Sequence, residues 1–124
     1  MAKIIIVDDS ETIRSQLKQV LEGAGHSVLE AVNGTDGYDK IVAMGNPDLV
    51  ISDYNMPGTD GLSMLAKVKD KLGVGVFPIF MLTTETSGSL KAAGKEIGVC
   101  AWINKPFDSA KLLAGVTKIL ARKA

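Results

Sequence analysis

Acidic, hydroxyl and basic side chains each come directly after an apolar segment of this sequence. They are Asp8 and Asp9 after residues 4–7, Asp53 at the end of 48–53, Thr83 and Thr84 after 77–82, and Lys105 after 100–104. If the three carboxylates lie about 5 Å apart, each pair repels by about 3 kcal/mol at an effective dielectric constant of about 20. Lys105 offers one compensating charge, and clustered carboxylate oxygens with open water positions suit Mg²⁺. With both cations present, the site could accept a phosphoryl group.

The spacing of apolar residues predicts the elements that must bring these side chains together. Strands are expected at 3–7, 27–31, 48–53, 77–82 and 100–104, and helices at 11–23, around 38–45, around 62–72, at 86–97 and from about 108 to 121, with Ser10 and Asp108 as caps. Strands that alternate with helices predict an α/β fold, a doubly wound parallel sheet with helices on both faces. Ligands bind such sheets at the carboxyl ends of the strands, where the winding reverses direction.

The composition is that of one globular domain, to which we assign residues 1–124. The chain has 124 residues, of which 46% are hydrophobic and 23% charged, enough to bury a core. Its 14 acidic and 14 basic residues cancel, so nothing indicates a nucleic acid or a membrane surface as a partner. No apolar run is long enough to span a bilayer, no export signal is recognisable, and Cys100 is the only cysteine. We therefore expect a cytoplasmic protein.

Each of the polar features also has a purely structural interpretation. Asp8 and Asp9 could cap a helix, Asp53 could begin a turn, the two threonines could cap the next helix, and Lys105 with Pro106 could form a surface turn. The functional interpretation is favoured because all four features lie at the same end of a different strand. Four independent coincidences of this kind are improbable.

Four segments of the chain resemble the receiver domain of two-component response regulators. They are VDDS (7–10), DLVISDYNMPGTDG (48–61), MLTTE (81–85) and WINKPF (102–107). They follow the order and spacing of that family and extend over the whole chain. The resemblance implies a flavodoxin-like sheet with the strand order 2-1-3-4-5 and five helices.

The resemblance also implies a role for each residue of the cluster. Asp53 would take a phosphoryl group from a phosphohistidine of a sensor histidine kinase, which is nucleophilic catalysis by a carboxylate. Mg²⁺ would be held by Asp9, Asp53 and the backbone carbonyl of Asn55, with Asp8 acting largely through metal-bound water. Lys105 and Thr83 would bind the phosphoryl oxygens. Such a protein is a phosphoacceptor in signalling rather than an enzyme, although it assists its own phosphorylation and dephosphorylation.

Trp102 stands where the family has an aromatic residue, usually Tyr or Phe, that turns inward on activation. Because side chains alternate along a strand, Trp102 should share a face with Asn104, and we expect its ring to be partly exposed and free to rotate. Trp is larger than the usual residue and carries an N–H donor, a departure that bears on how completely the switch operates. The Lys105–Pro106 bond matches a peptide bond that is cis in the family.

The expected output is docking of another protein, because only three residues follow the predicted last helix. The docking face would be the fourth helix, fifth strand and fifth helix, including Lys91, Lys95, Trp102 and Lys111. Residues 94–107 and 81–85 resemble chemotaxis regulators, so we expect a monomer that acts on the flagellar motor switch or handles phosphate in chemotaxis. A phosphatase is a further expected partner.

Other functions are compatible with parts of the sequence. A receiver that acts as a phosphate sink, or in a pathway unrelated to motility, would carry the same site. A flavin-binding protein would need a Ser/Thr/Gly-rich loop where Asp8 and Asp9 would repel the phosphate. A Mg²⁺-dependent phosphatase that forms an aspartyl phosphate would carry Asp-x-Asp after the first strand, whereas here the acids are adjacent and Ser10 follows. A scaffold without phosphorylation would not need the complete set of Asp, Thr and Lys.

Overall fold

The computed structural model describes residues 2–73, 76–84 and 87–123. Within these ranges five strands alternate with five helices: β1 (Lys3–Val7), α1 (Glu11–Gly23), β2 (Ser27–Ala31), α2 (Gly34–Met44), β3 (Leu49–Ser52), α3 (Gly61–Leu72), β4 (Ile79–Thr83), α4 (Gly88–Ile97), β5 (Val99–Asn104) and α5 (Ser109–Lys123). All strand pairs are parallel, in the order β2-β1-β3-β4-β5. The predicted fold class and strand order are confirmed.

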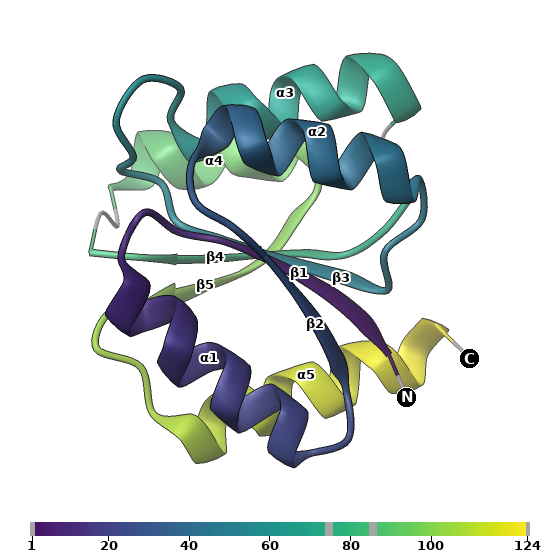
Figure 1. Ribbon diagram of the computed structural model, residues 1–124. Coiled ribbons are helices and arrows are strands. Elements are labelled where there is room, and N and C mark those ends of the chain that lie inside the picture. Colours follow the sequence, from purple (N-terminus) through teal and green to yellow (C-terminus); the bar gives the residue numbers. More distant parts are fainter. Residues whose placement is uncertain (1, 74–75, 85–86, 124) are drawn as a thin grey trace.

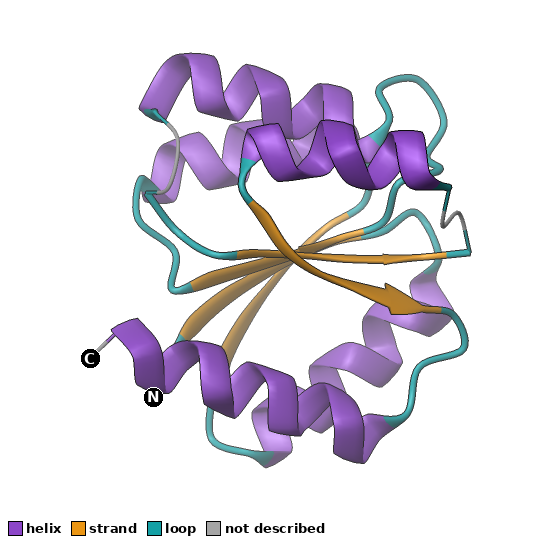
Figure 2. Ribbon diagram, turned by 180° about the vertical axis from the view of Figure 1, so that it is seen from behind, coloured by secondary structure: helices purple, strands orange, loops and turns teal. Residues whose placement is uncertain are grey.

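Helices cover both faces of the sheet. Figure 1 shows α2, α3 and α4 on one side and α1 with α5 on the other, and the view from behind in Figure 2 shows the same three layers. Side chains alternate along each strand, so Ile5 and Val7 pack under α2 and α3 while Ile4 and Ile6 pack against the other helix pair. Both faces of the sheet are therefore buried, which is why the strands are almost continuously apolar.

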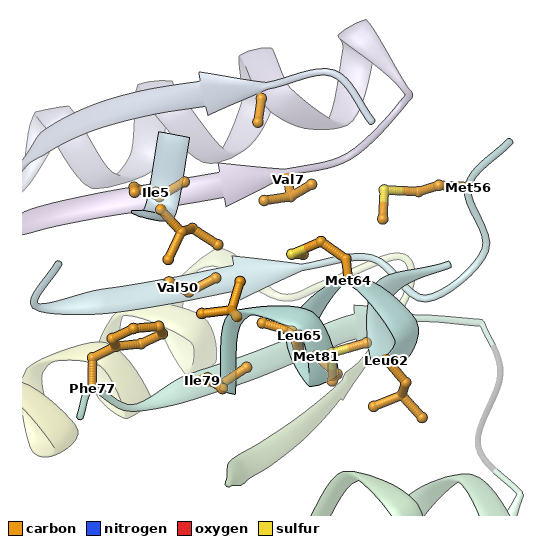
Figure 3. Packing of buried hydrophobic residues seen from close by; sticks show 13 residues of the cluster. Ile5, Val7, Val50, Met56, Leu62, Met64, Leu65, Phe77, Ile79 and Met81 are labelled. Atoms are coloured by element: carbon orange, nitrogen blue, oxygen red, sulfur yellow. The ribbon is translucent and has the colours of Figure 1, made fainter. Parts of the chain in front are cut away.

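Figure 3 shows the core beneath α3, which seats that helix on the sheet. Met64 and Leu65 of α3 point toward Val7, Val50 and Met81 on three adjacent strands. This packing fixes the helix relative to the carboxyl ends of β1 and β3. None of the described helices has the length and apolar character needed to cross a membrane.

Polar side chains cap the helices where the sequence predicts it. Ser10 Oγ accepts a hydrogen bond from the Ile13 amide at 3.3 Å, and Asp108 Oδ1 accepts from the Ala110 amide at 2.9 Å. α1 ends at Gly23, and Gly25 then turns the chain with φ at 93°, a conformation that glycine adopts without strain. Capping at these positions satisfies amides that have no partner inside the helix.

The structure differs from the predicted bounds at several ends. β4 starts at Ile79 instead of residue 77, because Pro78 has no N–H to donate and contributes only its carbonyl, which accepts from the Val50 amide. β3 spans Leu49–Ser52 instead of 48–53, although the Asp48 and Asp53 amides still donate to the Lys3 and Val7 carbonyls at 2.8 Å. The Asp48 carboxylate takes the Lys3 amide at 2.7 Å. α4 begins at Gly88, and residue 86 of its predicted span lies outside the described residues.

The fifth strand begins one residue earlier than predicted and contains an irregularity. Ile79 pairs with Val99 but Phe80 pairs with Ala101, so Cys100 is an extra residue in the ladder. A bulge of this kind keeps Val99 and Trp102 on one face of the sheet despite an even number of residues between them. The spacing of apolar residues cannot reveal such an insertion. The last helix extends to Lys123 rather than ending near 121.

Two side chains of α2 bind backbone groups at the free edge of the sheet beside β2. Lys40 Nζ donates to the Glu30 carbonyl at 2.6 Å and to Asp36 Oδ2 at 3.1 Å. Asp36 Oδ2 also accepts from the Val32 amide at 3.0 Å. An edge strand with unsatisfied backbone groups is a template for pairing with another chain, and these contacts occupy two such groups.

We predict that Asp36→Asn lowers the free energy of unfolding at pH 7 by about 1 kcal/mol, the usual value of a hydrogen bond to a partly exposed group. Burial alone would raise the pKa of Asp36, but the Val32 amide and the Lys40 ammonium lower it below the usual value. The ionised group therefore contributes stability above its unfolded pKa of about 3.9, and this contribution is lost as the pH falls through the lower folded pKa.

Urea unfolding of the parent and of Asp36→Asn at pH 7 and pH 3.5 measures this effect. The difference between the two proteins should shrink at the lower pH. Asp39→Asn, at an exposed position of the same helix, is the control and should unfold like the parent. A difference that grows on acidification would contradict the assignment.

Candidate functional site

The register of the sheet places Asp8 and Asp53 side by side. Val7 of β1 pairs with Ser52 of β3, and an aspartate follows each of these residues. The Asp53 amide donates to the Val7 carbonyl at 2.8 Å, which extends the ladder by one hydrogen bond beyond β3. Carboxylate oxygens of Asp8, Asp9 and Asp53 lie within 4.8 Å of one another. The acids predicted to converge at this edge do so.

Lys105 bridges two of the three acids. Its Nζ lies 2.8 Å from Asp8 Oδ2 and 3.1 Å from Asp53 Oδ2. Asp8 is 1% exposed and Asp53 5% exposed, so neither charge is well solvated and the ammonium group replaces water as their partner. Breaking a buried pair of this kind would leave an uncompensated charge inside the protein.

Burial and neighbouring charges shift the pKa values in this cluster. Burial raises the pKa of the Asp53 carboxyl, and the Asp8 charge adds to this, while the hydrogen bond and charge of Lys105 act in the opposite direction without cancelling the rise. Burial would lower the pKa of Lys105, but its bonds to Asp8 and Asp53 outweigh that effect and raise it. Asp53 is therefore a carboxylate that favours additional positive charge nearby.

Backbone amides fix the direction in which the carboxylates point. Asp8 Oδ1 accepts from the Ser10 amide at 2.9 Å, and Asp53 Oδ1 accepts from the Tyr54 amide at 2.7 Å. Each aspartate thus binds a main-chain donor with one oxygen and Lys105 with the other. The Oδ2 atoms of the two residues therefore meet at the same ammonium group, at the carboxyl ends of β1 and β3.

Gly61 is a site residue that sequence reasoning missed. A Cβ atom at this position would lie 2.0 Å from the Asp53 carbonyl oxygen, so only glycine allows the start of α3 to approach so closely. The Gly61 amide also donates to the Tyr54 carbonyl at 2.8 Å. The signal in the sequence is the pair Asp60-Gly61, where an N-cap is followed by a glycine that no turn requires.

The remaining predicted site residues lie around this cluster. Thr83 is fully buried at the end of β4, and its carbonyl accepts from the Lys105 amide at 3.2 Å. Asn55 is exposed in the loop after β3. The Lys105–Pro106 peptide bond is cis. The structure therefore brings the acids and Lys105 into contact and places Thr83 beside them in the sheet.

Trp102 is not part of the acidic cluster and packs against α4. It is half-buried on β5, where a Cβ atom at Gly94 of α4 would lie 2.6 Å from Trp102 Cζ2. Gly94 lacks a side chain, which lets the indole pack directly on the helix. The ring is partly exposed as expected, and its rotation on activation stays a prediction. Its ring also packs against the core under α3 and α4.

The donor set suits a hard divalent cation. The candidate side-chain ligands are carboxylate oxygens, two of them on buried residues and one on an exposed residue, so a bound ion would also keep a solvated side. Oxygen-only ligands with open water positions are typical of Mg²⁺ sites and unsuited to softer metals. The residues therefore fit the cation predicted from the sequence.

This fold and this site together define a receiver-type signalling domain. Residues 4–117 match the family described as response regulator receiver domain. The chain belongs to the response regulator receiver family.

Individual relatives agree with this assignment. The chain is 36% identical to protein PilH of Pseudomonas aeruginosa, over 98% of this chain and 99% of PilH. It is 38% identical to the phosphate regulon transcriptional regulatory protein PhoB of that organism, over 96% of this chain but only 52% of PhoB. Among solved structures, chemotaxis protein CheY4 of Vibrio cholerae matches with a TM-score of 0.87 and 37% identity, over 96% of this chain and 98% of CheY4.

We predict that Asp8→Asn stabilises the metal-free protein by about 1 to 3 kcal/mol. The substitution removes one of three close negative charges and keeps an oxygen that can accept from Lys105, which still pairs with Asp53. Urea unfolding in EDTA measures the effect, and Mg²⁺ should raise the melting temperature of the parent more than that of the variant. Asp39→Asn again serves as the control, and an Asp8→Asn protein less stable than the parent in EDTA would refute the prediction.

Proposed function

We propose that this protein is a response regulator that accepts a phosphoryl group on Asp53 from a histidine kinase in a Mg²⁺-dependent reaction. One observation carries the proposal: a buried aspartate at the end of the third strand is bound by Lys105 and lies within 4.8 Å of two more acids. Membership of the receiver family supports the same assignment.

The residues divide the chemistry of transfer among them. A carboxylate oxygen of Asp53 would attack phosphorus, forming an O–P bond while the N–P bond to the donor histidine breaks and that imidazole takes up a proton. Asp8, Asp9, Asp53 and the Asn55 carbonyl would hold Mg²⁺, which when bound neutralises charge on the phosphoryl oxygens. Lys105, already 3.1 Å from Asp53, would pair with a phosphoryl oxygen. The Thr83 hydroxyl would donate to another.

The output would be docking on the face formed by α4, β5 and α5. Lys91, Lys95 and Lys111 are exposed there. A groove of about 340 Å³ runs beside Trp102, with Asn104, Pro106 and Lys111 along it. The likeness to CheY4 supports a target in chemotaxis, with the flagellar motor switch as the partner to test. Pull-down with purified switch protein should succeed only in the presence of beryllofluoride and Mg²⁺.

A second candidate is a receiver in another two-component pathway, or one that drains phosphate from a kinase. The similarity to PhoB, at 38% identity, supports this candidate, because a transcriptional regulator matches this chain as well as a chemotaxis protein does. Failure to bind the motor switch in either state would favour it. In both candidates the phosphorylation site is the same.

Phosphorylation of Asp53 is tested with acetyl phosphate, a small-molecule donor. Intact-mass spectrometry should show one added phosphate on the parent and none on Asp53→Asn, because Asp53 is the proposed nucleophile. EDTA should abolish the addition. Asp60→Asn is the matched control, since Asp60 caps α3 close to the site and should leave phosphorylation intact. Undiminished labelling of Asp53→Asn would overturn the assignment.

We also predict that Trp102 reports activation. It is the only tryptophan, so fluorescence has a single source. If Thr83 is drawn toward a phosphoryl group, the half-exposed indole can move deeper, and its emission should shift to shorter wavelength with weaker iodide quenching on addition of beryllofluoride and Mg²⁺. Thr83→Ala should bind the mimic without this response. Unchanged emission, with binding of the mimic confirmed by mass spectrometry or NMR, would exclude Trp102 as the switch.

A further inference from the structure

Arg14 of α1 connects the acidic site to the edge strand β2. Its Nη1 donates to the Asp8 carbonyl oxygen at 2.8 Å, and its Nε donates to Glu30 Oε1 at 3.3 Å. The Arg14 side chain is only 12% exposed, whereas Glu30 is 33% exposed. A largely buried guanidinium that binds two acceptors with separate nitrogens holds both in a fixed relation.

The contact with Arg14 completes the set of hydrogen bonds that surrounds Asp8. The carboxylate binds the Ser10 amide with Oδ1 and Lys105 with Oδ2, and the Asp8 carbonyl oxygen binds Arg14. All three oxygens of the residue are therefore held by donors from different parts of the chain. Of these three donors, only Arg14 binds the main chain between Asp8 and Asp9. Both carboxylates project from this part of the chain.

We infer that Arg14 is a positioning residue for the cation site, and that Glu30 anchors it. In this arrangement Arg14 sets the path of the main chain after β1, so that the Asp8 and Asp9 carboxylates face Asp53 before any cation binds. The inference rests on the proposed Mg²⁺ site and adds two residues to it that do not contact the cation. Glu30 in particular has no hydrogen bond to the three acids among the described interactions and acts through Arg14.

Loss of the Arg14 charge and loss of its positioning effect would change the affinity for Mg²⁺ in opposite directions, which makes the inference testable. A guanidinium close to a cation site repels the cation, so if Arg14 acted by charge alone its removal would tighten Mg²⁺ binding. If Arg14 positions the turn, its removal weakens binding, by about tenfold as for other residues that orient metal ligands. The two mechanisms cannot be confused in a measurement of affinity.

The experiment is an NMR titration of ¹⁵N-labelled protein with MgCl₂, following amide shifts at the acidic site. We compare the parent with Arg14→Ala and Lys18→Ala. Lys18 is the matched control, because it lies one turn further along α1 and its Nζ also pairs with Glu30, at 3.6 Å. It has no contact with Asp8 among the described interactions. Arg14→Ala should bind Mg²⁺ about tenfold more weakly, and Lys18→Ala within about twofold of the parent.

A second readout needs no metal. The Ser10 amide is bonded to Asp8 Oδ1, so its hydrogen exchange reports how well Asp8 is held. In EDTA, exchange at Ser10 should be faster in Arg14→Ala than in Lys18→Ala, while amides in the centre of β3 exchange alike in the two variants. A general loss of stability would speed exchange at both places.

Glu30→Gln leaves Arg14 in the sequence and tests whether Glu30 anchors it. It should weaken Mg²⁺ binding in the parent, and this effect should largely vanish in the Arg14→Ala background, because the two residues act in series. Tighter or unchanged Mg²⁺ binding in Arg14→Ala would overturn the inference and leave the proposed function standing. Absence of Mg²⁺ binding by the parent would instead refute the proposed site itself.

Discussion

The structure of this site depends on one ammonium group held between two buried carboxylates. Lys105 lies 2.8 Å from Asp8 and 3.1 Å from Asp53, and without it two buried like charges would lie side by side with little solvation. The lysine comes from the end of β5, two strands away from β3, so its side chain must cross the end of β4. That reach depends on the strand order of the sheet, in which Thr83 ends the intervening strand β4 and accepts from the Lys105 amide.

The cluster remains short of positive charge after Lys105 is counted, and this imbalance gives the site its chemistry. Three carboxylates face one ammonium, with Arg14 bound to main chain and to Glu30 instead of to the acids. The raised pKa of Asp53, caused first by burial and then by the charge of Asp8, expresses the same shortage. In the proposed function a divalent cation would relieve this shortage, and a phosphoryl group would then bind where protein carboxylates alone would repel it.

A change at Asp53 has a short physical route to the surface of the molecule. Lys105 lies three residues beyond Trp102 on the same chain segment, and its amide is bonded to the Thr83 carbonyl. Movement of Thr83 or Lys105 would therefore act directly on the end of β5, beside the groove that Trp102 and Lys111 line. The indole packs on Gly94 of α4, so displacement of the ring would also act on that helix. In the proposed function, this is how a local charge becomes a change in a docking surface.

The sequence by itself determined the element types, the fold class and the edge at which Asp8, Asp9, Asp53 and Lys105 meet. These follow from local periodicity and from the rule that the carboxyl ends of parallel strands lie at the same edge of a sheet. Both arguments need only a single sequence. Caps such as Ser10 and Asp108 were equally predictable, because a cap depends on neighbours within a few residues. Tertiary structure alone decided that Arg14 grips the Asp8 carbonyl, that Gly61 must lack a side chain beside Asp53, and that Gly94 receives the Trp102 ring. These contacts join residues whose separation in space depends on strand register, helix rotation and a bulge at Cys100, none of which leaves a local pattern in the sequence.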